Sequence, residues 1–129
     1  MARDAVKGDA ESSIISFAGS VEDITAEHVA KAAREYDETA RSVLRRAGKA
    51  LGVGLSNVVN LFDPETIVMG GGVVQAGEAF LGAARDQLAA MTASQRRRPM
   101  RLDVTSLGSD AGIIGAAALA WDEVTGTAT

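Results

Sequence analysis

The chain has 129 residues, of which 47% are hydrophobic, and this predicts one domain with a single buried core. It contains no cysteine, which excludes disulfide bonds, zinc bound by thiolates and cysteine nucleophiles. The formal net charge of −4 and the lack of a membrane-spanning stretch predict a soluble cytoplasmic protein that contacts neither nucleic acid nor membranes directly.

The first predicted elements are short helices. Residues 2–9 read as the end of a helix that stops near Gly8, and an apolar segment follows that ends at Gly19. Thr25 is a typical N-cap residue and begins the next helix. Apolar residues recur along it at intervals that predict one buried stripe: Val29, Ala32, Ala33 and Tyr36. The single histidine, His28, is expected at the surface, with an acid–base role as the less favoured alternative.

The longest predicted helix begins after Asp37 and ends before Pro64, because the proline ring disfavours the α conformation of the preceding residue. Charged residues concentrate in its first half and apolar residues in its second, so we expect the second half to enter the core. The expected buried stripe is Leu44, Leu51, Leu55, Val58 and Phe62. Gly52 and Gly54 indicate a close neighbour, and a packed helix is favoured over a ligand.

A short run of mostly apolar residues, Thr66–Met69, follows the proline. Its β-branched residues and its lack of alternation predict a strand buried on both faces, as in a parallel sheet. Gly70, Gly71 and Gly72 come directly after it. Glycines at the carboxyl end of such a strand can adopt positive φ and let a nucleotide or phosphate approach closely.

The remaining elements predict a strand–helix–strand unit. An amphipathic helix begins near Gly77 and fades by Ser94. Its expected buried stripe is Phe80, Leu81, Ala84, Leu88 and Met91. Three arginines follow in a segment for which we favour a solvated connector over a phosphate site: Arg96, Arg97 and Arg98. Residues 101–105 alternate between polar and apolar, which predicts a half-buried strand near a sheet edge.

Residues 111–121 form the last predicted helix. Ser109 or Asp110 is expected to cap it. Its glycines and alanines predict very close packing on the sheet. Residues 125–129 are expected to form a frayed tail.

No complete catalytic motif is present. The glycine run lacks the third spaced glycine of a dinucleotide-binding fingerprint, because Gln75 stands in its place. Gly48 and Lys49 lie inside a predicted helix, without the hydroxyl residue that a P-loop needs for magnesium. There is also no nucleophile elbow, no histidine pair and no carboxylate pair placed for acid–base work. The residues alone predict a turn that a ligand can approach, with no catalytic or metal-binding residue.

Four segments, taken together, carry a family resemblance. They are residues 51–57 (Leu-Gly-Val-Gly-Leu-Ser-Asn), 60–64 (Asn-Leu-Phe-Asp-Pro), 67–72 (Ile-Val-Met-Gly-Gly-Gly) and 107–117 (Leu-Gly-Ser-Asp-Ala-Gly-Ile-Ile-Gly-Ala-Ala). Their order and spacing resemble the C-terminal part of ROK proteins, which are repressors, open reading frames and sugar kinases. The resemblance implies an α/β fold that is part of an actin-like, ribonuclease-H-like ATPase domain, with helices packed on a small sheet.

The resemblance also implies a ligand site, because in this family the triple-glycine turn borders the adenosine and phosphates of ATP. Six residues are expected beside this pocket: Gly70, Gly71, Gly72, Gly52, Gly54 and Asn57. ATP with magnesium is therefore implied for the parent protein, and zinc is not, because the family's zinc motif is missing. The family's first phosphate loop and catalytic aspartate are also missing, so we expect weak or absent ATP binding by this chain.

We expect residues 25–124 to be the C-terminal part of a ROK domain, residues 1–24 to be an N-terminal remnant and residues 125–129 to be a flexible tail. The favoured parent is an ATP-dependent sugar kinase, in which this part forms the adenosine side of the cleft and is inactive alone. One alternative is the sugar-sensing and dimerisation domain of a ROK transcriptional repressor, and another is a module for assembly only. The expected partners are sugar and ATP in the parent protein and a second copy of the chain in a homo-oligomer.

Overall fold

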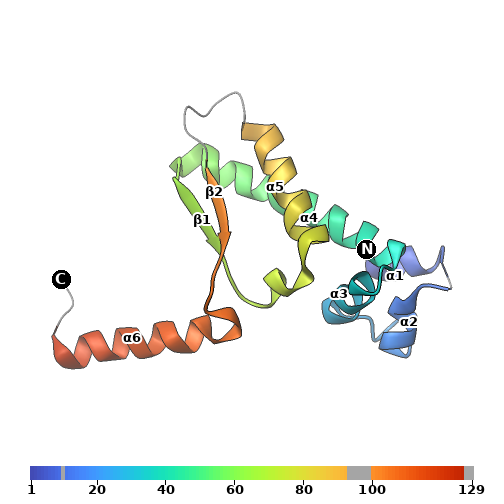
Figure 1. Cartoon of the computed structure of the whole chain (residues 1–129), viewed down its shortest axis with the longest axis horizontal. Helices are drawn as coiled ribbons and strands as arrows, with labels where there is room; N and C mark the ends of the chain where they lie inside the picture. The colour runs from blue at the N-terminus through green and yellow to red at the C-terminus, as the bar shows by residue number, and fades with distance from the viewer. Residues whose placement is uncertain (10, 93–99, 127–129) are drawn as a thin grey trace.

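The computed structural model describes residues 1–9, 11–92 and 100–126. Figure 1 shows a cluster of short helices at one end, a pair of long helices beside a small sheet, and a last helix that stands away from the rest. In chain order the elements are α1 (Ala2–Val6), α2 (Ser13–Ala18), α3 (Ala26–Arg34), α4 (Glu38–Phe62), β1 (Thr66–Met69), the 3-10 helix η1 (Gly72–Ala76), α5 (Glu78–Thr92), β2 (Arg101–Val104), the 3-10 helix η2 (Gly108–Asp110) and α6 (Ala111–Thr125).

The core lies where the three short helices meet the first half of α4 and the start of α5. Val6 and Ile14 of the short helices are almost completely buried in it. Leu44 of α4 and Phe80 of α5 complete the same cluster. The N-terminal segment is therefore packed into the core that it shares with α4 and α5.

The first turn of α3 and the residues after its end differ in part from the prediction. Thr25 caps α3 as expected, and the Nδ1 atom of His28 accepts a hydrogen bond from the Thr25 backbone nitrogen at 3.3 Å, so His28 is itself part of the cap. The prediction for Tyr36 is wrong. α3 ends at Arg34, and Tyr36 adopts a φ of 65°, which turns its side chain out of the stripe and leaves it 76% exposed.

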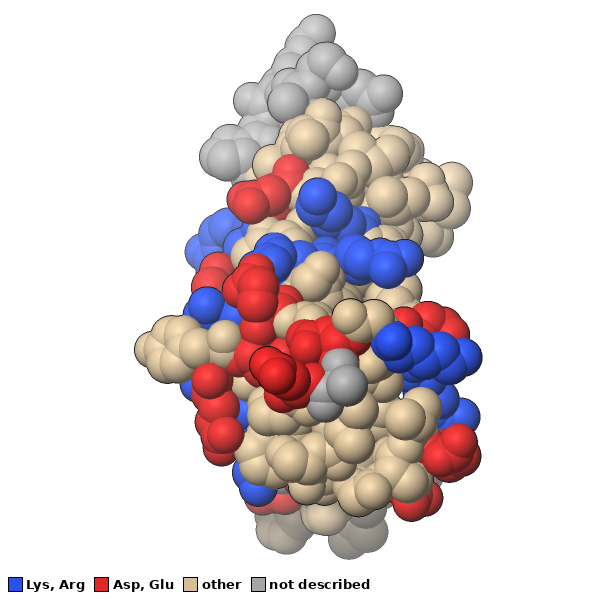
Figure 2. Space-filling view, turned by 90° about the vertical axis from the view of Figure 1, so that its right-hand side faces the viewer, with Lys and Arg blue, Asp and Glu red and all other residues tan. Residues whose placement is uncertain are grey.

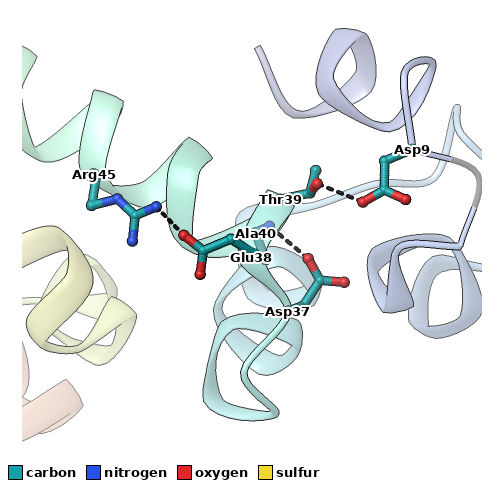
Figure 3. A network of polar contacts seen from close by, with 6 residues as sticks. All are labelled: Asp9, Asp37, Glu38, Thr39, Ala40 and Arg45. Carbon is teal, nitrogen blue, oxygen red and sulfur yellow. Dashed lines mark hydrogen bonds and ion pairs between the residues drawn. The ribbon is translucent and has the colours of Figure 1, made fainter.

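Asp37 joins the start of α4 to the start of α2. Its Oδ1 atom accepts a hydrogen bond from the Ala40 backbone nitrogen at 2.7 Å, which is the predicted cap of α4 (Figure 3). Its Oδ2 atom accepts from the Ser12 hydroxyl at 2.8 Å and from the Ser13 backbone nitrogen at 2.7 Å. Thr39 donates to Asp9 at 2.6 Å in the same region (Figure 3). The first part of the chain is thus held to α4 by polar contacts as well as by the core.

The two long helices α4 and α5 pack at glycines of α4. A Cβ atom on Gly48 would lie 2.1 Å from the Phe80 carbonyl oxygen, and one on Gly52 would lie 2.6 Å from the Ala84 carbonyl oxygen. Only glycine therefore permits this approach of the two backbones. The close neighbour predicted at Gly52 is α5, whereas the prediction for Gly54 is wrong, because a Cβ atom there would meet nothing within 4 Å.

The predicted buried stripe of α4 is correct at Leu44, which is 7% exposed, and wrong at Val58 (41%) and Phe62 (70%). In the second half of the helix, Gly52, Ser56 and Val59 are buried instead. The buried residues of α4 are Ala40, Val43, Leu44, Gly48, Gly52, Ser56 and Val59. Small residues at positions 48, 52 and 56 leave a groove for α5, and the larger side chains of Val58 and Phe62 lie outside it.

β1 and β2 form a two-stranded parallel sheet in which Ile67 pairs with Leu102 and Met69 with Val104. The crossover contains α5, which confirms the strand–helix–strand prediction. The prediction that β1 is buried on both faces is wrong, because Val68 is 63% exposed. Helices cover only one face of this sheet in the described part of the chain (Figure 1). The three arginines predicted to form a connector lie outside the described residues.

α6 differs most from the prediction. It begins after Asp110, as expected, but the Asp110 side chain makes no capping hydrogen bond, and the helix continues past Trp121 to Thr125. It does not pack on the sheet. It has no buried residue and extends away from the strands (Figure 1). Within the described residues no helix is long and apolar enough to cross a membrane.

Candidate functional site

Two turns lie side by side at the carboxyl edge of the sheet. Because β1 and β2 are parallel, the turn after β1 (residues 70–72, the glycine turn) and the turn after β2 (residues 105–110, the β2 turn) start at the same edge. The Thr105 backbone nitrogen donates a hydrogen bond to the Met69 carbonyl oxygen at 2.8 Å. A Cβ atom on Gly70 would lie 3.1 Å from Cγ2 of Thr105, so the two turns are in contact. Ligands of open parallel sheets bind at this edge.

The glycine turn is open on its outer side. Gly71 has a φ of 79°, a conformation that other residues rarely adopt, and it caps the 3-10 helix η1. A Cβ atom on Gly71 or Gly72 would meet nothing within 4 Å. Both residues are exposed. A ligand can therefore reach the backbone here without meeting a side chain of these residues, and backbone N–H groups in such turns are donors to anionic oxygens.

The β2 turn is held by its own hydrogen bonds. The Leu107 backbone nitrogen donates to the Thr105 hydroxyl at 3.1 Å, and the Asp110 backbone nitrogen donates to the Leu107 carbonyl oxygen at 3.2 Å. Gly108 has a φ of 58°, and a Cβ atom there would meet nothing within 4 Å. This second glycine is half-buried and also has open space beside its Cα atom, on the loop next to the glycine turn.

Thr105 and Gly108 are not among the site residues predicted from the sequence. The predicted order of strand, helix and parallel strand contained the signal, because parallel strands end at one edge and their following turns must meet there.

The other predicted site residues lie on α4. Gly52 is buried under α5, where Ala84 and Gln87 occupy the space beside it. Gly54 and Asn57 are exposed, and a Cβ atom on Gly54 would meet nothing within 4 Å. Contact of these three residues with a nucleotide stays a prediction.

The carboxyl edge of the sheet presents backbone N–H groups and hydroxyl groups, which can bind a ligand. Among the residues that the structure describes, no three His, Asp or Glu side chains are grouped so that they could hold a metal ion. Within β2, Asp103 pairs with Arg101 at 2.8 Å and raises the pKa of that guanidinium. The backbone N–H groups of this edge can hold an anionic ligand, and the β2 turn also contains the carboxylate of Asp110.

A separate hollow of about 480 Å³ lies on the outer side of the α4 and α5 pair. Arg45 and Glu78 are among its lining residues, and each forms an ion pair, Arg45 with Glu38 and Glu78 with Arg85. Figure 2 shows basic and acidic side chains interleaved over one face of the molecule, so no single sign of charge covers it. Its other charged lining residues, Lys49 and Asp86, have opposite signs, so the hollow carries no excess of positive charge.

The sequence matches one family model over residues 4–123, and the model is described as the ROK family. The chain is 30% identical over 124 residues to a glucokinase of Thermotoga maritima. The match covers 96% of this chain and 39% of that protein. It is 27% identical over 114 residues to a xylose repressor of Caldicellulosiruptor bescii, of which it covers 28%. The chain thus spans less than half the length of these curated relatives.

The fold matches solved structures. A ROK family glucokinase from Streptomyces griseus, in complex with glucose and AMPPNP, superposes with a TM-score of 0.81 at 31% identity over 92% of this chain and 39% of that one. A structure from Cytophaga hutchinsonii shares the fold and superposes with a TM-score of 0.74 at 24% identity. These matches confirm the predicted fold class, an α/β part of an actin-like ATPase domain.

Proposed function

The chain belongs to the ROK family, and from this premise we propose that it is the C-terminal part of an ATP-dependent sugar kinase that forms the adenosine side of the nucleotide cleft. The observation that carries the proposal is the glycine turn. It is intact, exposed and free of side-chain obstruction at the carboxyl edge of a parallel sheet. The similar Streptomyces griseus glucokinase was solved with glucose and AMPPNP, which supports a nucleotide as the ligand.

The proposed contribution of this chain is binding and positioning. Gly70, Gly71 and Gly72 present backbone groups to the adenosine and phosphates, and the β2 turn borders them. Phosphoryl transfer also needs a general base for the sugar hydroxyl and a second set of phosphate contacts. The sequence holds neither the acidic-glycine-glycine-threonine loop nor the aspartate that the family uses for them. The chain by itself is therefore inactive as a kinase, and its ATP affinity is weak.

A second candidate is the sugar-sensing and dimerisation part of a ROK transcriptional repressor. The specific observation in its favour is the similarity to the xylose repressor, which extends over 88% of this chain. The coding sequence upstream of this chain would distinguish the kinase from the repressor. A helix-turn-helix there would contradict the kinase, and a phosphate loop there would contradict the repressor. A role in assembly only is the third candidate, supported by the exposed apolar residues of α6.

Backbone NMR tests the site directly, because it detects binding at millimolar dissociation constants. We expect AMPPNP with magnesium to shift the amide signals of Gly70, Gly71 and Gly72 and those of the β2 turn. The variant Gly72→Leu should abolish these shifts, because its side chain fills the open space over the turn.

A matched control is Gly112→Leu, which is also exposed in open space, but on α6, and should leave the shifts unchanged. Nucleotide-dependent shifts confined to the hollow between α4 and α5 would contradict the proposed site. Micromolar affinity for ATP would contradict the claim that the chain supplies only part of the cleft.

A further inference from the structure

The turn between α3 and α4 holds Tyr36 in a conformation that tyrosine rarely adopts. The Tyr36 backbone nitrogen donates a hydrogen bond to the Ala33 carbonyl oxygen at 3.2 Å, and the Asp37 backbone nitrogen donates to the Ala32 carbonyl oxygen at 3.1 Å. These are the two hydrogen bonds of a Schellman motif, in which the residue at the position of Tyr36 has positive φ and is usually glycine. Tyr36 has a φ of 65° there, so its backbone is strained. The motif uses only backbone atoms at this position, and glycine would form it without the strain.

The Tyr36 side chain lies at the surface, where the residue is 76% exposed. Its ring contacts Arg41 of α4, whose guanidinium carbon lies 4.8 Å from the ring centre. A guanidinium at this distance is attracted by the face of an aromatic ring. The strained turn therefore supports an exposed ring that is paired with a cation.

Arg41 has no ion pair and no side-chain hydrogen bond within the part of the chain that the structure describes. The acidic residues one turn before it are Asp37 and Glu38. The Asp37 carboxylate already accepts hydrogen bonds from Ala40 and from two serines at α2. Glu38 pairs with Arg45. The guanidinium of Arg41 thus keeps its N–H donors for an acceptor from outside the chain, and a carboxylate fits their fork geometry.

The segment around this pair is basic. Residues 31–49 carry six basic and three acidic side chains, whereas the whole chain has a formal net charge of −4. Charge complementarity therefore favours an acidic partner. Tyr36 is exposed, Arg41 is half-buried, and neither lines the hollow beside α4 and α5. An open pair of this kind fits the surface of a protein better than a small molecule, and tyrosine and arginine are enriched in protein interfaces.

We propose that Tyr36 and Arg41 form a docking site for an acidic segment of a partner protein. A carboxylate of the segment binds the N–H groups of Arg41, and a neighbouring apolar side chain packs on the exposed ring of Tyr36. The strained turn keeps the ring outward before the partner arrives, so that binding needs little further ordering. The site shares no residue with the glycine turn or the β2 turn, and the inference does not depend on the kinase.

Tyr36 can be observed alone, because it is the only tyrosine of the chain. The full chain is prepared with tyrosine that carries carbon-13 in its ring, and NMR follows the signals of that one ring. The probe is a synthetic peptide, Gly-Glu-Leu-Glu-Leu-Glu-Gly, and its counterpart has glutamine in place of each glutamate. We expect the acidic peptide to shift the ring signals until they saturate, and the glutamine peptide to leave them unchanged. Added sodium chloride should weaken the binding of the acidic peptide.

Two arginine variants lose the same charge and make the test specific. Arg41→Gln should weaken the binding of the acidic peptide by about tenfold or more, as the loss of a central interface residue does. Arg46→Gln is the matched control, because Arg46 is exposed five positions further along α4 and lies on another side of the helix. This change should alter the affinity by less than about twofold. Equal losses in the two variants would show unspecific attraction between charges and would overturn the proposal.

A third variant, Tyr36→Gly, separates binding from folding. It removes the ring and the strained conformation together, so we expect a higher urea midpoint of unfolding and a loss of peptide binding, measured by the anisotropy of a fluorescein-labelled peptide. A lower midpoint would show that the ring serves the fold, and it would overturn the proposal. An acidic peptide that leaves the Tyr36 signals unchanged would overturn it as well. If sodium phosphate or phosphatidylglycerol vesicles shift these signals and the peptide does not, the site belongs to a phosphate or a lipid surface instead.

Discussion

At the scale of single residues, Asp37 connects more of the chain than any sequence pattern indicates. Its carboxylate accepts hydrogen bonds from Ala40 in α4 and from Ser12 and Ser13 at α2. Burial alone would raise the pKa of Asp37, but these hydrogen bonds outweigh it and lower the pKa below its ordinary value of 3.8. The charged form is therefore the one that the folded chain stabilises.

We expect Asp37→Ala to reduce the free energy of unfolding at pH 7 by about 2 kcal/mol, because it removes a helix cap and leaves the buried Ser12 hydroxyl without this acceptor. Asp37→Asn should cost less, about 1 kcal/mol, since its amide oxygen can still accept one of these bonds. Urea unfolding followed by circular dichroism measures both values. An unchanged midpoint for Asp37→Ala would show that the contacts at α2 do not form in solution.

The same residue predicts a pH dependence. A carboxylate whose folded pKa is lowered stabilises the protein above its unfolded pKa, and this stabilisation is lost as the pH falls through the folded pKa. The stability difference between the wild type and Asp37→Asn should therefore be constant near neutral pH and shrink as the pH falls below 3.8. Urea unfolding repeated from pH 7 to pH 2.5 tests this expectation. A difference that grows toward acid would contradict it.

Glycines of α4 give opposite predictions, depending on the face they occupy. Gly48→Ala should destabilise the chain by about 2 kcal/mol, because the added methyl group meets the Phe80 carbonyl oxygen and must push α5 away. Gly54→Ala is the matched control in the same helix. Its methyl group meets nothing, and the better helix propensity of alanine should stabilise the chain by about 0.5 to 1 kcal/mol. Equal effects of the two changes on the urea midpoint would refute the α4 and α5 packing described here.

At the scale of elements, local signals predict where the helices begin and end. Thr25 and Asp37 cap α3 and α4, and α4 ends just before Asp63 and Pro64, as the sequence indicates. The buried face of α4 was not predictable in the same way. Hydrophobic patterns weight large side chains, whereas α5 packs against the groove that small residues leave, and that choice depends on a neighbour far along the chain.

The same distinction applies to the candidate site, where one turn is predictable from the local sequence and the other is not. The glycine turn is visible in the sequence, because three glycines after an apolar run are rare and have a direct conformational meaning. Thr105 carries no such local signal, and its place beside Gly70 follows only from the parallel pairing of β1 with β2. The apolar patterns of β1 and α6 predict burial, and both predictions are wrong for this chain, since Val68 is 63% exposed and α6 has no buried residue.

α6 gives a prediction about the free energy of unfolding. Because it has no buried residue, deletion of residues 111–129 should change the unfolding free energy of the remaining chain by no more than about 0.5 kcal/mol, the usual range for surface changes. Urea unfolding of the shortened and full chains, followed by circular dichroism, measures this. A loss of several kcal/mol would show that α6 folds back onto the sheet in solution and would contradict the open arrangement.

At the scale of the whole molecule, the uncovered surface should appear in the cooperativity of unfolding. The dependence of stability on urea, the m-value, is proportional to the surface that unfolding exposes. With an accessible surface of 8489 Å² in the folded state, unfolding exposes about 15% less new surface than it would for a compact monomer of this mass.

We therefore expect an m-value about 15% below that of compact domains of equal length. Replicate urea titrations followed by circular dichroism can resolve this difference if the isolated chain, the shortened chain and compact reference domains are measured together. An m-value for the isolated chain equal to that of the compact references would mean that its apolar surface is already covered, either by its own sheet or by a second copy.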